Sequence, residues 1–112
     1  MHTIYVFDDF ELDRARFELR RGGERVTIQP KQLRLLFYLV ARRGRAVANE
    51  ELLGALWPTV TVCSGSLKRA VRGVRSALGE KGAAPWRIRT IRCYGYAFVP
   101  HVADVMRSTV AA

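Results

Sequence analysis

The residues of this sequence best suited to a chemical role are the bases of one short stretch, Ser64–Leu78. The stretch holds Lys68, Arg69, Arg72 and Arg75 and no acidic residue. Cationic side chains pair with phosphates, and arginine also matches the acceptor edge of guanine. Surface helices usually mix charges, because opposite charges three or four residues apart stabilise each other. A face of one sign therefore indicates a polyanionic partner, with a merely solvated basic face as the alternative.

The same stretch has the period of an amphipathic helix. Its apolar residues recur with the spacing of a buried stripe, and they are Leu67, Val71, Val74 and Leu78. The opposite side carries Ser66, Arg69, Arg72 and Ser76, and one flank carries Lys68 and Arg75. We therefore expect a helix that buries one side and presents its bases on the other.

The charge of the whole chain agrees with this interpretation. The 112 residues carry a net charge of +9, and residues 64–92 hold eight bases against a single acid, Glu80. Such an asymmetry favours a nucleic-acid surface over general solubility. The length and the 49% hydrophobic content suit one domain with an ordinary core.

Membrane and export signals are not evident in the sequence. No apolar run approaches the roughly 20 residues that a membrane-spanning helix needs. The opening residues, MHTIYVFDDFELD, show no basic segment followed by an apolar one, so no signal peptide is expected. We expect a cytoplasmic location and no membrane contact by this segment.

The cysteines and histidines do not suggest a metal site or an enzyme. Cys63 and Cys93 have no histidine near them in sequence, and His2 and His101 lie near the termini without a nucleophile or carboxylate constellation. We expect two reduced thiols, with a redox switch between them as the alternative. No metal, cofactor or catalytic residue is expected.

The elements that must hold the basic helix follow from period and turn signals. Residues 1–28 predict an antiparallel sheet of three or four short strands, with a hairpin through Gly22-Gly23. Residues 30–78 predict three helices, and residues 86–99 predict a strand–turn–strand hairpin. Residues 101–112 form a tail that is either a short helix or the start of a linker. Residues 1–100 would then be one domain.

Helix boundaries are signalled by individual residues. Pro30 suits the first turn of the first helix, and Gly44 follows its basic end. Asn49 is expected to cap the second helix and Ser64 the third. Gly79 supplies the left-handed residue that commonly follows a helix.

Three helices followed by a hairpin make the layout of a winged helix-turn-helix, in which the last helix enters the major groove. Five segments of this sequence resemble the OmpR/PhoB-type DNA-binding effector domain of response regulators and ToxR/CadC-like one-component regulators. They are VFDDFELD, QPKQLRLLFYLVARRGRAV, NEELLGALWP, VRSAL and IRTIRCYGYAFVP, spread over about residues 4–100. The resemblance implies an α+β winged helix-turn-helix. Its parts are an N-terminal antiparallel four-stranded sheet, three helices and a C-terminal β-hairpin wing.

The resemblance also implies a role for each matching position. On the third helix, Arg69, Arg72 and Gly73 match positions that face the bases. Ser66 and Arg75 match positions that contact phosphates, and Lys68 is placed to join them.

Outside that helix, Arg92 matches the wing arginine that enters the minor groove, and Arg89 adds a base to the same hairpin. Trp57 matches an aromatic residue that lies against the DNA backbone, although a packing role is the alternative. The loop Pro58–Cys63 matches a loop that can meet RNA polymerase.

Two positions depart from the family pattern. Gly73 stands where a long side chain, frequently arginine, is usual, so Arg69 and Arg72 would carry more of the base reading. Cys93 stands where the wing usually has glycine, and a positive φ there would strain the turn.

The predicted function is sequence-specific binding of double-stranded DNA for bacterial transcription regulation, with a homodimer on direct repeats implied by the resemblance. One alternative is a non-specific architectural or RNA-binding module that uses the same positive face. Another is a basic protein-interaction domain with an acidic partner.

Overall fold

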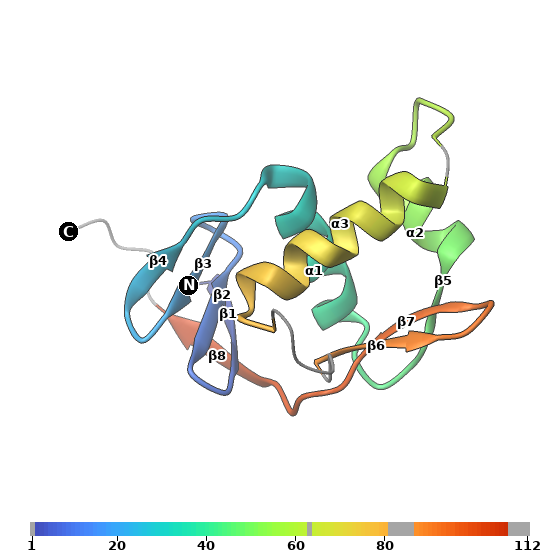
Figure 1. Cartoon of the computed structure of the whole chain (residues 1–112). Helices are drawn as coiled ribbons and strands as arrows, with labels where there is room; N and C mark the ends of the chain where they lie inside the picture. Colours follow the sequence, from blue (N-terminus) through green and yellow to red (C-terminus); the bar gives the residue numbers. More distant parts are fainter. Residues whose placement is uncertain (1, 63, 81–86, 108–112) are drawn as a thin grey trace. The chain divides into compact units, whose positions relative to one another are not determined.

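The computed structural model describes residues 2–62, 64–80 and 87–107, and its chain folds as two units (Figure 1). One unit combines the two ends of the chain, Met1–Thr27 and Pro100–Ala112, and the other is Ile28–Val99. The first holds a sheet, and the second holds the helices and the hairpin.

The sheet unit is a five-stranded antiparallel sheet in the order β4-β3-β2-β1-β8. Its strands are β1 (His2–Phe7), β2 (Phe10–Asp13), β3 (Glu18–Arg21), β4 (Glu24–Val26) and β8 (Ala103–Arg107). Short polar turns join the first four strands, and β3 pairs β4 across the two glycines with Arg21 opposite Glu24. The four-stranded N-terminal sheet expected from the sequence is thus confirmed as β1–β4.

The fifth strand corrects the prediction for the end of the chain. Of the two alternatives for the tail, a short helix or the start of a linker, the helix is wrong over Ala103–Arg107, because these residues pair antiparallel with β1, with Val105 opposite Ile4. Val102, Val105 and Met106 have helical spacing, but the open edge of β1 offers unpaired backbone donors and acceptors that a strand satisfies. The remaining residues of the predicted tail, 108–112, lie outside the described residues.

Several large apolar side chains of the sheet unit are almost fully buried. They include Ile4, Phe7, Phe10, Leu12 and Leu19. The rings of Phe7 and Phe10 stack with centroids 5.3 Å apart, and Arg21 lies over the Phe10 ring while its Nε donates to Asp9. Aromatic packing and one charged pair therefore hold the β1–β2 turn to β3.

The helical unit contains the three expected helices and the expected hairpin. Its elements are α1 (Pro30–Ala41), β5 (Val47–Ala48), α2 (Asn49–Leu56), α3 (Ser64–Ala77), β6 (Ile88–Ile91) and β7 (Gly95–Phe98). In Figure 1, α3 lies across α1, which it contacts, and β6 and β7 form the hairpin. This order of elements is that of a winged helix-turn-helix.

The helices begin and end close to where the sequence indicates. Pro30 is the first residue of α1, as expected. The cap of α2 is Ala48 in extended conformation, so the prediction of Asn49 as the cap is wrong by one residue. α3 begins at Ser64 itself, which was the expected cap, and the residue before it lies outside the described residues.

The end of α3 is fixed by a Schellman motif. Gly79 has φ 79°, its N–H donates to the carbonyl of Ser76, and the N–H of Glu80 donates to the carbonyl of Arg75. These two bonds satisfy carbonyls that the end of a helix leaves open. The predicted role of Gly79 is therefore confirmed.

A third strand in the hairpin sheet was not anticipated from the sequence. β5 pairs with β7, so the order is β5-β7-β6, with Val47 opposite Tyr96 and Ala48 opposite Gly95. A side chain on Gly95 would collide with the backbone carbonyl of Val47. The hairpin is thus joined to the segment between α1 and α2, and only glycine permits this close approach.

Replacing Gly95 by alanine should loosen the hairpin. The added Cβ would push β7 from β5, and overpacking of this kind costs about 1–3 kcal/mol. The free energy of unfolding, measured with urea, should fall for Gly95→Ala. Gly54→Ala is the matched control, because a Cβ at this exposed helical position meets nothing within 4 Å. It should leave stability unchanged or raise it by up to about 1 kcal/mol. Equal stabilities of Gly95→Ala and the original chain would refute the close-approach argument.

Candidate nucleic-acid interface

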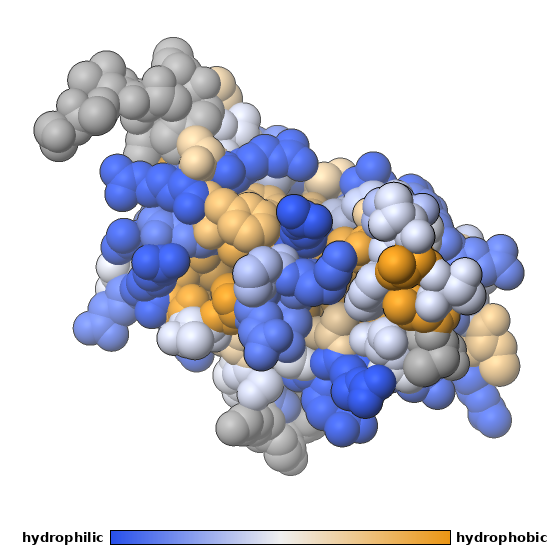
Figure 2. Space-filling model, turned by 90° about the horizontal axis from the view of Figure 1, so that it is seen from above, coloured by the Kyte–Doolittle hydropathy of each residue, from blue (hydrophilic) through white to orange (hydrophobic). Residues whose placement is uncertain are grey.

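The two faces predicted for α3 are present in the structure. Leu67, Val71 and Val74 are buried, whereas Lys68, Arg69 and Arg72 are exposed. In the view of Figure 2 hydrophilic residues predominate on the surface, with apolar patches between them. The exposed side of α3 is therefore a basic face, here defined by Lys68, Arg69 and Arg72.

The charge of the chain belongs to the helical unit. Within Ile28–Val99 there are thirteen lysines and arginines against three glutamates, whereas the sheet unit holds six bases and seven acids. A positive potential of this kind raises the local concentration of a polyanion and speeds its association.

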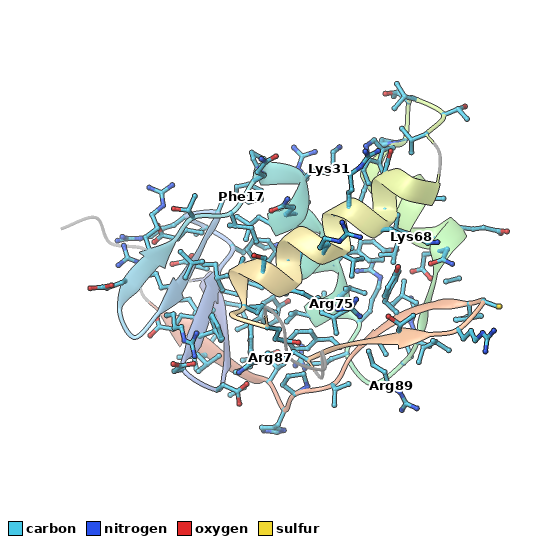
Figure 3. The ribbon with its side chains drawn as sticks, viewed as in Figure 1. Phe17, Lys31, Lys68, Arg75, Arg87 and Arg89 are labelled. Carbon is cyan, nitrogen blue, oxygen red and sulfur yellow. The ribbon has the colours of Figure 1, made fainter. Side chains whose placement is uncertain are left out.

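Arg75 connects α3 to the hairpin. Its Nη2 donates to the carbonyl of Ile88 at 2.6 Å and to the hydroxyl of Thr90 at 2.8 Å, and its guanidinium lies 5.9 Å from the ring centre of Tyr96. Its Nε is buried without a hydrogen-bond partner in the part of the chain that the structure describes. Figure 3 shows this half-buried side chain between α3 and the hairpin. Arg75 therefore fixes β6 against α3, a contact that the sequence did not reveal.

The three arginines of the hairpin segment have different surroundings. Arg87 is largely buried and pairs with Glu80 at 3.4 Å, so it serves the end of α3. Arg89 alternates with Thr90 along β6, so its exposed side chain lies on the face of the hairpin turned away from Arg75 (Figure 3). Arg92 is exposed in the turn. Arg92, not Arg89, is thus placed at the tip.

The hairpin turn is held by backbone hydrogen bonds. The N–H of Tyr94 donates to the carbonyl of Ile91 at 2.9 Å, and the N–H of Asn49 donates to the carbonyl of Tyr94 at 2.8 Å. Cys93 has φ 61°, so the positive φ that would strain a non-glycine residue in this turn is present. The tip thus exposes Arg92, Cys93 and the 49% exposed Tyr94 on a fixed backbone.

Gly73 does not present an open position on the basic face. A Cβ placed on it would meet the side-chain amide of Gln32 from α1. The glycine therefore makes room for a side chain from another helix, which sequence spacing alone could not reveal. Ser66, also predicted to contact DNA, is half-buried.

Trp57 is half-buried at the end of α2, where Lys31 contacts it. The ammonium of Lys31 lies 5.3 Å from the centre of the indole and donates to the carbonyl of Leu56 at 2.5 Å. This cation closes the C-terminal end of α2, as the helix dipole favours. The following residues Pro58, Thr59, Val60 and Thr61 are exposed, with Val60 at 58%, and Cys63 lies outside the described residues.

A charged cluster joins α1 to α2. Arg45 donates to both carboxylate oxygens of Glu51 at 3.1 and 2.8 Å, and the hydroxyl of Tyr38 donates to the same carboxylate at 2.6 Å. Arg42 lies 3.5 Å from Glu51 and over the Tyr38 ring. These hydrogen bonds, that from Arg45 foremost, lower the pKa of Glu51 from 4.5 to about 2. The bond to Glu51 also raises the pKa of Tyr38.

The described residues hold no group of three histidine, cysteine or acidic side chains suited to a metal ion. Among their helices, none is long and apolar enough to cross a membrane.

A family model described as "Transcriptional regulatory protein, C terminal" matches residues 23–98. The transcriptional regulatory protein AfsQ1 of Streptomyces coelicolor is 30% identical over 95 residues, which cover 84% of this chain and 42% of AfsQ1. The chain thus spans less than half the length of such curated relatives.

Solved structures show the same fold. The response regulator DrrB of Thermotoga maritima, an OmpR/PhoB homologue, aligns with a TM-score of 0.79 and 27% identity over 86% of this chain and 44% of DrrB. The DNA-binding domain of Klebsiella pneumoniae RstA, solved in complex with the RstA box, aligns with a TM-score of 0.76 and 27% identity. That alignment covers 88% of this chain and 98% of the RstA domain.

The Glu51 cluster should make stability depend on pH. A depressed folded-state pKa stabilises the fold above the unfolded value of 4.5, and this contribution is lost as pH falls toward about 2. Glu51→Gln should therefore be less stable than the original chain at neutral pH, and the difference should shrink across that window in urea unfolding. Glu50→Gln, a change at the exposed neighbour, is the control and should cost less stability at neutral pH. A constant Glu51→Gln difference from pH 5 to 2 would contradict the assignment.

The Arg75 contact predicts an energetic coupling with Thr90. Arg75→Met keeps the aliphatic packing but removes the donors, and Thr90→Val removes one acceptor. Residues in direct hydrogen-bond contact couple by about 0.5–3 kcal/mol in double-mutant cycles. Urea unfolding of the two single variants and the double variant measures this term. A coupling near zero would show that the hydroxyl bond does not hold the hairpin.

Proposed function

The chain belongs to the OmpR/PhoB-type family of transcriptional regulators and is a sequence-specific DNA-binding domain; we propose that it binds with α3 in the major groove and the hairpin tip in the adjacent minor groove. The observation that carries this proposal is the basic face of Lys68, Arg69 and Arg72, exposed on a helix whose other side is buried. The proposal is supported by the similarity in fold to the RstA DNA-binding domain, which was solved in complex with the RstA box.

Base reading is assigned to Arg69 and Arg72. Both are exposed on α3, and arginine makes paired hydrogen bonds with the O6 and N7 acceptors of guanine. Lys68 on the same face, with Ser66 beside it, would contact phosphates, which position the protein without reading sequence. The hairpin engages Nη2 of Arg75, so only the rest of its guanidinium could contact DNA. The main role proposed for Arg75 is therefore to position β6.

Arg92 is assigned to the minor groove. It is exposed at the tip, and its neighbour Tyr94 is held by backbone bonds to Ile91 and Asn49. A cationic side chain inserted into a narrow minor groove meets an enhanced negative potential. Arg89, on the outer face of the hairpin, contributes long-range attraction.

The remaining roles extend to other macromolecules. The exposed loop after Trp57, with Val60 at its surface, is proposed to meet RNA polymerase, and Trp57 itself to lie against the DNA backbone. Binding as a homodimer on direct repeats is proposed from the family. A cytoplasmic location is proposed as well, because the proposed function is on DNA.

Alanine substitution of Arg69 or Arg72 tests the proposal. A duplex is first selected from random DNA with the original chain, and affinity is then measured by fluorescence anisotropy. Each substitution should weaken binding about tenfold or more and relax the preference for a base pair, since a paired contact is worth about 1–3 kcal/mol. Lys68→Ala should weaken binding to all duplexes alike and lower the salt dependence by about one counterion.

The control is Arg34→Ala, which removes the same charge from an exposed position on α1. It should change affinity far less than the α3 substitutions. Equal affinity of the original chain for unrelated DNA and RNA at about 0.2 M salt would favour a non-specific module, because specific binders keep a margin of about 10³ or more. Full DNA retention by the double variant Arg69→Ala/Arg72→Ala would favour a protein-interaction domain.

A further inference from the structure

The surface of α3 at position 73 is completed by a residue of α1. Gly73 has no side chain, and the space where its Cβ would stand is occupied by the amide group of Gln32. The nearest atom is Nε2, followed by the amide carbon, with Oε1 at 2.8 Å. Gln32 therefore takes the place of a short polar side chain on α3.

This position adjoins the basic face. Gly73 follows Arg69 by one helical turn and is next to Arg72 in sequence, and residues four apart are neighbours on a helix surface. Gln32 is half-buried, so part of its side chain remains accessible. Its amide thus stands beside the side chains that are assigned to base reading.

The hydrogen bonds of Gln32 leave its donor available. Oε1 accepts from the backbone N–H of Gln29 at the long distance of 3.4 Å, which helps to close the first turn of α1. Nε2 has no acceptor among the residues that the structure describes, and a side-chain amide has two N–H donors. A donor that points at the edge of a cationic DNA-binding face meets DNA acceptors when DNA is bound.

We propose that Gln32 is a DNA-contacting residue supplied by α1, whose Nε2 donates to a hydrogen-bond acceptor of the DNA held against α3. The acceptor is either a phosphate oxygen or a base edge, such as the N7 atom of adenine, to which a glutamine amide can donate in the major groove. This inference rests on the proposed placement of α3 in the major groove. It also gives the glycine in the middle of α3 a physical role, because a larger residue would displace the amide.

The decisive variant is Gln32→Glu. It keeps the shape of the side chain but replaces the donor by a negative charge facing DNA. Glutamate is a favourable residue in the third position of a helix, where it can still accept from the backbone, so α1 should be as stable as before or more stable. Affinity for the selected duplex should fall about tenfold or more, because a like charge is brought against the DNA. The affinity of Gln32→Ala for the same duplex should fall about fivefold, the usual effect of one lost hydrogen bond.

The matched control is Gln29→Glu. It makes the same change of charge in the same exposed turn of α1, at a residue that Gly73 does not contact. It should alter affinity less than twofold. Equal losses for Gln29→Glu and Gln32→Glu would overturn the proposal, since a general change of charge would then explain both.

A second route leaves Gln32 intact. Gly73→Ala displaces the amide, so it should weaken DNA binding by a similar factor, and the double variant Gln32→Ala/Gly73→Ala should be no weaker than Gln32→Ala alone. Independent, multiplying losses would overturn the proposal. Unfolding curves for each variant establish that the affinities belong to folded protein.

The selected duplex and its single-base variants distinguish the two acceptors. A relaxed preference at one base pair in Gln32→Ala assigns the contact to a base edge, and an equal loss on all duplexes assigns it to a phosphate; either result supports the proposal. If Gln32→Glu binds as well as the original chain while Arg69→Ala loses binding, the role of Gln32 is refuted and the proposed function stands. Retained binding in Arg69→Ala and Arg72→Ala would refute the proposed function itself.

Discussion

The placement of the hairpin against α3 depends on the hydrogen bonds that Arg75 donates to the hairpin. Its Nη2 donates to the carbonyl of Ile88 and to the hydroxyl of Thr90, so this one side chain ties α3 to β6. In the proposed complex α3 and the hairpin occupy neighbouring grooves, and a separation that is fixed before binding favours affinity because ordering the two on DNA would cost free energy. The planar fork of arginine makes both bonds in one conformation, which a lysine would not reproduce.

The basic face and the buried face of α3 act in opposite directions on its stability. Lys68 and Arg72 are four residues apart, and like charges at that spacing destabilise a helix by a few tenths of a kcal/mol. Burial of Leu67, Val71 and Val74 against the helical unit more than offsets this, and the Schellman motif at Gly79 fixes the last turn. Phosphates bound at this face, as proposed, would relieve the repulsion that remains. The charge pattern thus favours the bound state.

The two departures from the family pattern have different physical consequences. Gly73 costs α3 about 1 kcal/mol of helix propensity relative to alanine, and in return the amide of Gln32 fits against the helix. Cys93 gains no comparable contact among the described residues. Its positive φ is a conformation that non-glycine residues adopt at a cost, and the backbone hydrogen bonds of Tyr94 and Asn49 hold the turn in it. In the proposed complex, Gln32 would add a contact from α1 to those made by α3.

The sequence by itself determined the elements whose signals are local. The period of Ser64–Leu78, the stop at Gly79 and the hairpin after residue 86 depend on neighbours along the chain, so three helices, a wing and a basic face could be predicted. Tertiary structure alone decided that Ala103–Arg107 extends the sheet, that Arg75 holds the hairpin and that Gln32 fills the space at Gly73. These contacts join residues far apart in sequence, and their geometry exists only after the elements have packed, which no local period or turn signal records.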